Sequence, residues 1–293
     1  MSFVQRALGF TFTLGTGSFG NSGSNTITAP SGLWATAQIQ KNGTPSMNRA
    51  NIRIKGLSLS VMNQLSRIGV LPTAVRNNIV TVTAGDAGGN MPLAFAGYIK
   101  EAWPDFSNPT EAVLTIEAFT GLLAQMKPVP PLSFAGSTDV ATIMGQLAQQ
   151  MGYTLENNGV SVQLRNPYLP GTARSQALAA ADAAGIYVVF DDDNGVMAIL
   201  PKTAARGGAA PVISPAEEMV GYPTYVGPGQ LALTTEYNSQ IRFMGNVNVQ
   251  NSIVGGANGT WRVTSLMHDL STLPDGPWFS HVQGNNLYSA QGA

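Results

Sequence analysis

Three glycines near the start of the chain have a spacing that could bind a nucleotide. Gly15, Gly17 and Gly20 match a dinucleotide fingerprint, and the strand-like segment FTFTL precedes them. In that fingerprint a helix follows at once, so that its free amides meet the pyrophosphate. Here NSGSN follows, which does not favour a helix, and no acidic residue lies near position 40 to bind a ribose. The pattern therefore predicts no cofactor.

A run of three aspartates could hold a cation. Asp191, Asp192 and Asp193 precede Asn194-Gly195, and calcium prefers several carboxylate and carbonyl oxygens in one loop. An EF-hand would place a glutamate near position 202, where Lys202 stands. We interpret the run as a charged hairpin turn closed by Asn194-Gly195. The sequence leaves open whether an ion binds there.

The two histidines have no catalytic surroundings in the sequence. His268 precedes Asp269, but adjacent residues on a strand point to opposite faces, so they form no dyad. His281 follows Ser280, and no Gly-x-Ser-x-Gly elbow occurs anywhere. Two histidines so far apart make no zinc motif. We therefore expect no catalytic residue, no metal site and no enzymatic activity.

Paired carboxyl groups would suit glycoside hydrolysis. Glu217 and Glu218 are adjacent, and Glu111 and Glu117 are scattered, so nothing brings two carboxyls to a defined distance. Adjacent glutamates are typical of a solvated turn. The tryptophans could line a glycan groove, but Trp261 alternates with Val263, which is typical of a core. A carbohydrate-binding or cell-wall-degrading β-rich protein stays open as an alternative.

The composition favours a protein that is covered by partners. The chain has 293 residues, of which 44% are hydrophobic and only 11% charged, with a net charge of −1 and no cysteine. Charged residues are about 25% of a usual soluble protein, so much of this surface is poorly protected against association. Without a basic patch, a signal peptide or a long apolar stretch, we expect no specific nucleic-acid binding and no stable membrane insertion.

Hydrophobic periodicity divides the chain into regions. We expect a strand at 8–14 and an extended arm within residues 1–30 that orders against a neighbour. Residues 31–127 alternate with period two, as in Leu33, Ala35, Ala37 and Ile39, which predicts antiparallel strands with a short helix at 57–68 and a helical turn at 120–125. This region is the first predicted β-domain.

Residues 128–205 predict a small α+β domain. Apolar residues recur with helical spacing from Val140 to Met151, after a cap at Thr138 or Asp139 and before Gly152. A hairpin at 153–164, a helix at 175–184 and a hairpin at 186–200 follow. Residues 206–293 return to strands, at 231–235, 241–249, 261–266 and 278–283. Four Asn-Gly pairs, beginning at positions 42, 158, 194 and 258, predict type I′ hairpin tips.

Several segments in this order resemble baseplate hub proteins of contractile-tailed bacteriophages. They include SGLWATAQIQKNG, ANIRIKGLSLSVMNQLS, NNIVTVTAGDAGG and FAGYIKEAWPDFSNP in the first half. The second half adds DVATIMGQLAQQMGYTLENNGVSVQL, ISPAEEMVGYPTYVGPG and NGTWRVTSLMHDLSTLPDGPWFS. The resemblance covers about residues 31–280. These motifs are structural rather than catalytic, and their order and spacing carry the match.

The resemblance implies a β-rich α+β chain in which two tail-tube-like antiparallel β-barrel domains, 31–127 and 206–293, flank the α+β domain at 128–205. It further implies a homotrimer that forms a pseudo-hexameric ring and adapts a six-fold tail tube to a three-fold spike. Implied partners are the tail tube protein, the tail spike protein, other baseplate proteins and the tape-measure protein in the lumen. The implied location is the virion tail baseplate, after assembly in the host cytoplasm.

We expect the functional site to be an interface rather than a pocket. Exposed apolar and glycine-rich segments are typical of contacts, which points to the arm with Phe10, Phe12 and Phe19. The loop at Asp86 and Met91 and the turn from Pro274 to Trp278 are the other predicted contact segments. A further alternative function is another tail-tube component, although a minimal tube protein needs only one barrel.

Overall fold

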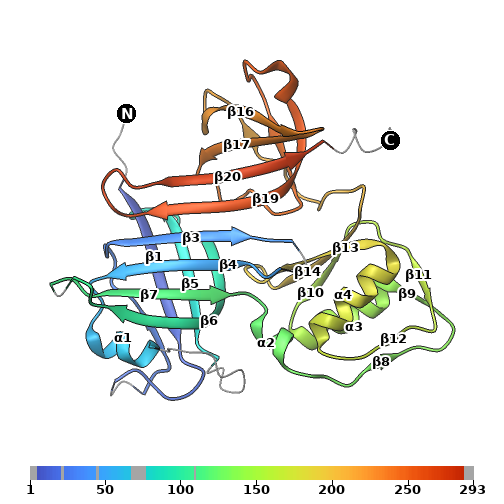
Figure 1. The fold of residues 1–293 in the computed structure, drawn as a ribbon, viewed down its shortest axis with the longest axis horizontal. Coiled ribbons are helices and arrows are strands. Elements are labelled where there is room, and N and C mark those ends of the chain that lie inside the picture. The colour runs from blue at the N-terminus through green and yellow to red at the C-terminus, as the bar shows by residue number, and fades with distance from the viewer. Residues whose placement is uncertain (1–4, 21–22, 44–45, 67–76, 109, 287–293) are drawn as a thin grey trace. The chain divides into compact units, whose positions relative to one another are not determined.

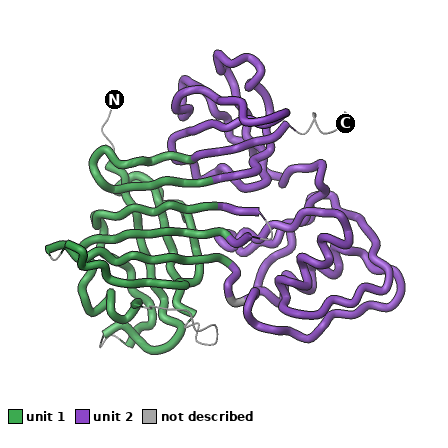
Figure 2. The backbone as a smooth tube through the Cα atoms, viewed as in Figure 1, with its two compact units in different colours: residues 1–40, 48–120, 267–280 green, residues 41–47, 121–266, 281–293 purple. Residues whose placement is uncertain are grey.

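The computed structural model describes residues 5–20, 23–43, 46–66, 77–108 and 110–286 (Figure 1). The chain falls into two compact units, each discontinuous in sequence (Figure 2). Unit 1 comprises residues 1–40, 48–120 and 267–280, and unit 2 comprises residues 41–47, 121–266 and 281–293. In the described part of the chain, no helix is long and apolar enough to cross a membrane.

Unit 1 is built on antiparallel strands in the order β19-β3-β4-β7-β6-β5-β1-β2. Their bounds are β1 (Arg6–Thr13), β2 (Thr26–Thr28), β3 (Ala35–Lys41), β4 (Arg49–Lys55), β5 (Ile79–Asp86), β6 (Leu93–Asp105), β7 (Val113–Phe119) and β19 (Gly259–Ser271). Period-two alternation places one face of each strand in the core, as with Ile52 and Ile54 on β4 and Leu114 and Ile116 on β7. The helix α1 (Leu59–Leu65) begins after its N-cap Ser58 and lies within the range 57–68 where the sequence predicts a short helix.

The described residues of the N-terminal segment fold onto their own unit rather than extending as an arm. β1 pairs along its whole length with β5, from Arg6↔Asp86 to Thr13↔Ile79. β2 then pairs back onto β1, and Phe19 between them is buried. The expectation that residues 1–30 order only against a neighbour is therefore wrong for the described part of this segment. The alternating FTFTL pattern places Phe10 and Phe12 in the core.

Unit 2 contains a small α+β region. It comprises α2 (Leu122–Met126), β8 (Leu132–Ser133), β9 (Ser137–Asp139), α3 (Val140–Met151), β10 (Thr154–Asn157), β11 (Gln163–Arg165), β12 (Tyr168–Leu169), α4 (Ala173–Ala184), β13 (Ile186–Asp191) and β14 (Val196–Pro201). Asp139 caps α3 by accepting a hydrogen bond from the Ala141 amide, and Gly152 ends it in the left-handed conformation. The apolar faces of α3 and α4 share one core with Val188 and Ile199 of the short sheet.

The rest of unit 2 is β-rich. Its elements are β15 (Val212–Ile213), β16 (Met219–Gly227), β17 (Gln230–Glu236), β18 (Asn246–Val249), η2 (Gly255–Ala257), and parts of β19 and β20 (Trp278–Asn285). The order β16-β17-β20-β19 continues through β18, which pairs with β19 and in parallel with β15. Trp261 and Val263 lie in the core that these strands enclose, as their alternation predicts.

The predicted β-rich α+β class is confirmed, and most pairings are antiparallel. The order of the described strands has open ends at β16 and β2, so no closed barrel is present among them. Sequence periodicity shows which side chains face a core, but it does not show whether the outer strands meet. The boundaries at residues 30, 127 and 205 stay a prediction.

Several local predictions differ from the structure. Residues 153–164 form no hairpin, because β10 pairs in parallel with β14 and β11 pairs with β9. The predicted strand 241–249 is only β18, since Met244 has a positive φ of 61° that interrupts it. The hairpins at Asn42-Gly43 and Asn194-Gly195 are confirmed by the β3–β4 and β13–β14 ladders. None of the four predicted Asn-Gly turns places its asparagine at positive φ, as type I′ would require.

Candidate functional site

An exposed apolar strand edge lies on unit 2. β16 is the terminal strand in the order of described strands, and its ladder partner is β17. We call Val220, Tyr222, Tyr225 and Val226 the β16 edge surface; all four are exposed, and Tyr225 is 76% exposed. Large apolar side chains exposed along one strand make that strand a candidate for protein contact.

The sequence of β16 also limits which strands could pair with this edge. Pro223 has no amide hydrogen to offer to another strand, and Gly221 has a φ of 72° within an irregular stretch between Val220 and Thr224. Proline and bulges on an edge restrict which strands can add to it. The edge is therefore suited to one matching partner surface rather than to open-ended association.

Unit 1 has a second edge, on the later half of β6. The residues of β6 up to Tyr98 pair with β5 on one side, and residues 98–105 pair with β7 on the other. Among the described residues, 100–105 have no second ladder partner. Pro104 lies within this half, where a proline is tolerated because its missing amide is not needed for a ladder. Among the described residues, unit 1 therefore has a partly unpaired edge on β6, besides β2 at the end of its strand order.

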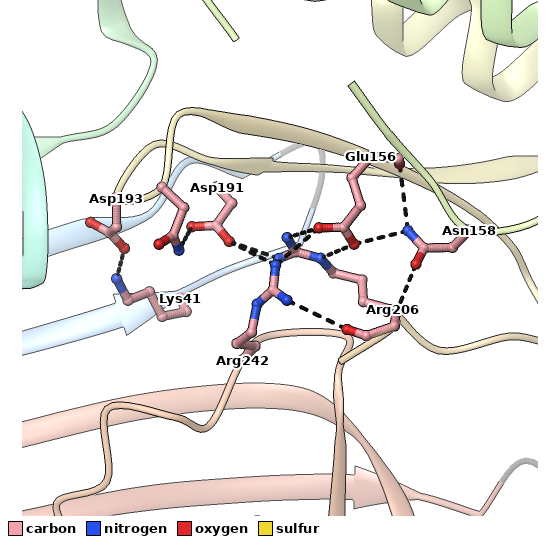
Figure 3. Close-up of polar contacts among 9 residues, drawn as sticks. Lys41, Glu156, Asn158, Asp191, Asp193, Arg206 and Arg242 are labelled. Carbon is pink, nitrogen blue, oxygen red and sulfur yellow. Dashed lines mark hydrogen bonds and ion pairs between the residues drawn. The ribbon is translucent and has the colours of Figure 1, made fainter. Parts of the chain in front are cut away.

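An ionic cluster in unit 2 surrounds the buried Arg206 (Figure 3). Arg206 is 3% exposed and forms a two-pronged pair with Glu156, through Nε to Oε1 at 3.1 Å and Nη2 to Oε2 at 2.9 Å. Its Nη1 donates to Asp191 Oδ2 at 2.9 Å. Arg242 donates from Nη2 to Glu156 Oε2 at 3.0 Å, so one carboxylate serves two guanidinium groups. The cluster joins β10, β13 and two loops.

The electrostatics of the cluster favour the ionised carboxylate. Burial pushes the pKa of Glu156 upward, but hydrogen bonds from Arg206 and Asn158 outweigh burial and bring the pKa to about 2. Burial likewise disfavours the charged form of Arg206, yet its two carboxylate partners leave its pKa raised. Glu156 and Arg206 therefore stay ionised over the ordinary pH range, and their ion pair holds the segments of the cluster together.

The three aspartates that could suggest a calcium loop are held by different groups. Asp191 accepts from Arg206, Asp192 accepts from the Tyr153 hydroxyl, and Asp193 pairs with Lys41. Within the described ranges, no three acidic, histidine or cysteine side chains converge to hold a metal ion. The run is a turn between β13 and β14, as interpreted from the sequence.

The remaining chemical candidates have structural contacts. His268 is buried, with Nδ1 2.9 Å from Ser280 Oγ, and His281 Nδ1 lies 3.1 Å from Thr234 Oγ1. Glu111 pairs with Lys55, and Glu117 pairs with Arg49 and Lys100. The segment from Gly15 to Gly20 lies in turns and bends, and β2 follows it.

The predicted contact residues lie partly in the core. Phe10, Phe12, Phe19 and Trp278 are buried within unit 1, so their side chains serve packing in this conformation. Arg6 brings two predicted sites together, because its Nη1 lies 2.6 Å from Asp86 Oδ1 and its Cζ lies 5.8 Å from the Trp278 ring. Met91 is half-buried and Pro274 is exposed. Contact of these segments with a partner stays a prediction.

Sequence reasoning missed the β16 edge surface. The segment MVGYPTYVG does not alternate cleanly, and its proline and glycines conceal a strand. The tyrosines on either side of Pro223 were the available signal, because aromatic residues are enriched both in strands and at interfaces.

Solved structures with a similar fold are tail proteins. The 43 kDa tail protein of prophage MuSo2 from Shewanella oneidensis has a TM-score of 0.58 at 9% identity, with 98% of each chain covered. A tail protein from Neisseria meningitidis MC58 has a TM-score of 0.60 at 10% identity, covering 94% of this chain and 96% of that one. These likenesses show that the chain has a fold also found in tail proteins.

A third similar structure comes from a related machine. It is an Escherichia coli component of the type VI secretion system, described as similar to the T4 bacteriophage tail proteins gp27 and gp5. Its TM-score is 0.55 at 10% identity, and the match covers 86% of this chain and 73% of that one. The comparison with curated protein sequences gives no match.

The family model for "Baseplate hub gp41" matches residues 10–284. The chain therefore belongs to this family of baseplate hubs. It is a structural component of the phage tail baseplate and not an enzyme, in agreement with the sequence prediction.

Proposed function

We propose that this hub adapts the symmetry of the tail, joining a six-fold tube to a three-fold spike as a pseudo-hexameric trimer. Each of three chains would present two tube-like β-regions, within 31–127 and 206–293, and so offer six similar edges to the tube. Three equivalent faces would then meet the spike. The other proposed partners are neighbouring baseplate proteins and the tape-measure protein in the lumen, with assembly in the host cytoplasm before incorporation into the virion.

One observation carries the proposal: among the described residues, each unit has a strand edge without a ladder partner. Unit 2 offers the β16 edge surface, and unit 1 offers residues 100–105 of β6. Two different edges on one chain favour a head-to-tail contact, which generates a ring when the rotation closes. Strand addition would satisfy the amide and carbonyl groups available on each edge, although Pro104 and Pro223 have no amide hydrogen to donate, and the exposed tyrosines of β16 would supply apolar area.

The low charge of the chain supports the same arrangement. Only 11% of the residues are charged, and several of those pair with one another in the ionic cluster of unit 2. A surface with few charges is costly for a free monomer but suits a subunit covered on several sides. The interior tie at Arg206 would keep unit 2 rigid while its edge is engaged.

The test is the mass of the assembled particle. Native mass spectrometry of the purified chain, alone and with tail spike protein, should give three times the 30.6 kDa mass of one chain. Six copies would instead indicate a tube component. A chain that stays monomeric with both tube and spike proteins present would refute the proposal, and electron microscopy of tails would locate the ring.

A further inference from the structure

One buried arginine in unit 2 lacks the counter-charge that its neighbours have. Arg262 on β19 is 6% exposed. Its Nε donates to Asn285 Oδ1 at 3.1 Å, and its Nη1 donates to the carbonyl oxygens of Lys202 at 2.8 Å and Ala204 at 2.7 Å. These bonds hold the guanidinium in one orientation. Throughout the described residues, no carboxylate lies within 4.0 Å of it, and its Nη2 makes no hydrogen bond.

Arg262 differs in this respect from Arg206, a second buried arginine of unit 2. Arg206 is buried to a similar depth in the same unit, and two carboxylates neutralise it. Arg262 has hydrogen bonds to three neutral oxygens and the ring of Tyr187, 5.8 Å from Cζ, but among the described residues no carboxylate pairs with it. Burial lowers the pKa of Arg262, but a guanidinium keeps its proton in proteins. Burying a charge without an opposite charge nearby is unfavourable, and a carboxylate from a neighbouring protein would offset that cost.

The surroundings of Arg262 limit what could match it. Arg262 lines a cavity of about 240 Å³ together with Tyr187, Phe243, Met244 and Asn285. Pockets for drug-sized molecules and cofactors range from about 300 to 1,000 Å³. The smaller cavity has room for one side chain, with apolar and aromatic walls around a single positive group. This chemistry fits a carboxylate carried on a short aliphatic stem.

We propose that the Arg262 cavity receives an aspartate or glutamate side chain of a neighbouring protein in the baseplate. The free Nη2 would donate to the carboxylate, while Tyr187 and Phe243 would cover its aliphatic stem and exclude water. The partner is therefore a protein segment with an acidic residue that protrudes from its surface. This inference rests on the proposed assembly, because it takes its occupant from a subunit of the same particle.

A matched pair of substitutions at the mouth of the cavity tests the charge balance. Tyr187 is 37% exposed, so Tyr187→Glu can place a carboxylate beside Arg262, whereas Tyr187→Gln has the same shape without the charge. The isolated glutamate variant should melt about 2–4 °C above the glutamine variant, because it supplies the missing partner. Equal melting temperatures would mean that Arg262 needs no counter-charge, and the inference would fail.

The same pair tests the contact in assembled tails. Each variant is co-expressed with the wild-type chain and the other tail proteins, and mass spectrometry of purified tails gives the incorporation ratio. Tyr187→Glu should be under-represented at least about thirtyfold relative to Tyr187→Gln, since its own carboxylate occupies the site and repels the incoming one. Equal incorporation of the two variants overturns the proposal.

A photo-cross-linker identifies the occupant. A chain with benzoylphenylalanine at position 187 is assembled into tails, and the tails are irradiated. The cross-linked peptide is then sequenced by mass spectrometry. A linked protein segment with Asp or Glu at or next to the attachment point supports the inference. If the chain is incorporated but cross-links only to segments without an acidic residue, or to no protein at all, the inference is overturned. The hub assignment is left intact in that case. Exclusion of even the wild-type chain from tails would instead refute the proposed function.

Discussion

Substituting Glu156 by glutamine removes the carboxylate that two arginines share, and the cost can be worked out from the structure. The fall of its pKa from 4.5 to about 2 means that the folded state prefers the ionised form. At about 1.4 kcal/mol per pKa step, this preference is worth roughly 3 kcal/mol. The side chain is 27% exposed, and solvent screening reduces the value to about 2 kcal/mol.

The sign of the pH dependence follows from the direction of this shift. Because the folded-state pKa lies below the unfolded one, the stabilisation is present in full above about pH 4.5 and is lost as the pH falls through about 2. Glu156→Gln should therefore unfold more easily than the wild-type chain at pH 7, by about 2 kcal/mol. Near pH 2 the two proteins should have nearly the same stability.

The assay is urea unfolding at a series of pH values between 7 and 2, followed by circular dichroism. Hydrogen exchange of β13 and β14 at one fixed pH identifies the transition that belongs to unit 2. The matched control is Glu217→Gln, in the same unit, because Glu217 is exposed and no described cation lies within 4.0 Å of it. Its stability should change by less than about 0.5 kcal/mol. Parallel pH curves for Glu156→Gln and the wild-type chain would refute the reasoning.

Three further substitutions test other parts of the structure. Gly85→Ala should lower the free energy of unfolding by roughly 2–3 kcal/mol, measured by thermal melting, because a Cβ there would overlap the Asn90 carbonyl oxygen. Tyr225→Lys should leave the free energy of unfolding of the monomer within about 0.5 kcal/mol of wild type, because Tyr225 is 76% exposed on the β16 edge surface. The same substitution should shift native mass spectra from trimer to monomer. An unchanged trimer would exclude this edge from the interface. Thr272→Val should cost about 1–2 kcal/mol in urea unfolding, because the hydroxyl accepts from the Ala35 amide at 2.8 Å and donates to the Leu33 carbonyl at 2.9 Å.

Local patterns predicted the helices of unit 2 closely. The apolar spacing from Val140 to Met151 and the stop at Gly152 match α3, and Gly185 ends α4 as expected. α4 begins at Ala173 rather than at Ser175, since Thr172 supplies the N-cap. These features depend on residues within a few positions of one another, so they can be read from the sequence directly.

Pairing between distant strands could not be read in the same way. The partner of β10 is β14, about forty residues later in the chain and beyond α4, so a hairpin was the wrong choice for residues 153–164. The candidate site had the same difficulty. Arg206, Glu156 and Asp191 come from three separate segments of the chain and meet in one cluster. The exposure of β16 depends on its place at the end of the strand order. Spacing along a chain carries no information on contacts of that range.

One segment of unit 1 is synthesised long after the strand beside which it packs, and this affects how the protein folds during synthesis. Residues 267–280 belong to unit 1, and Thr272 holds the Ala35 amide across 237 positions of sequence. A ribosome adding about 5–20 residues per second would need roughly 10–50 seconds to synthesise that stretch. During this interval one edge of β3 has no native neighbour, although its other edge can already pair with β4. The nascent chain therefore has a period of vulnerability to wrong strand pairing, and slower translation or lack of a chaperone should reduce the yield of native hub.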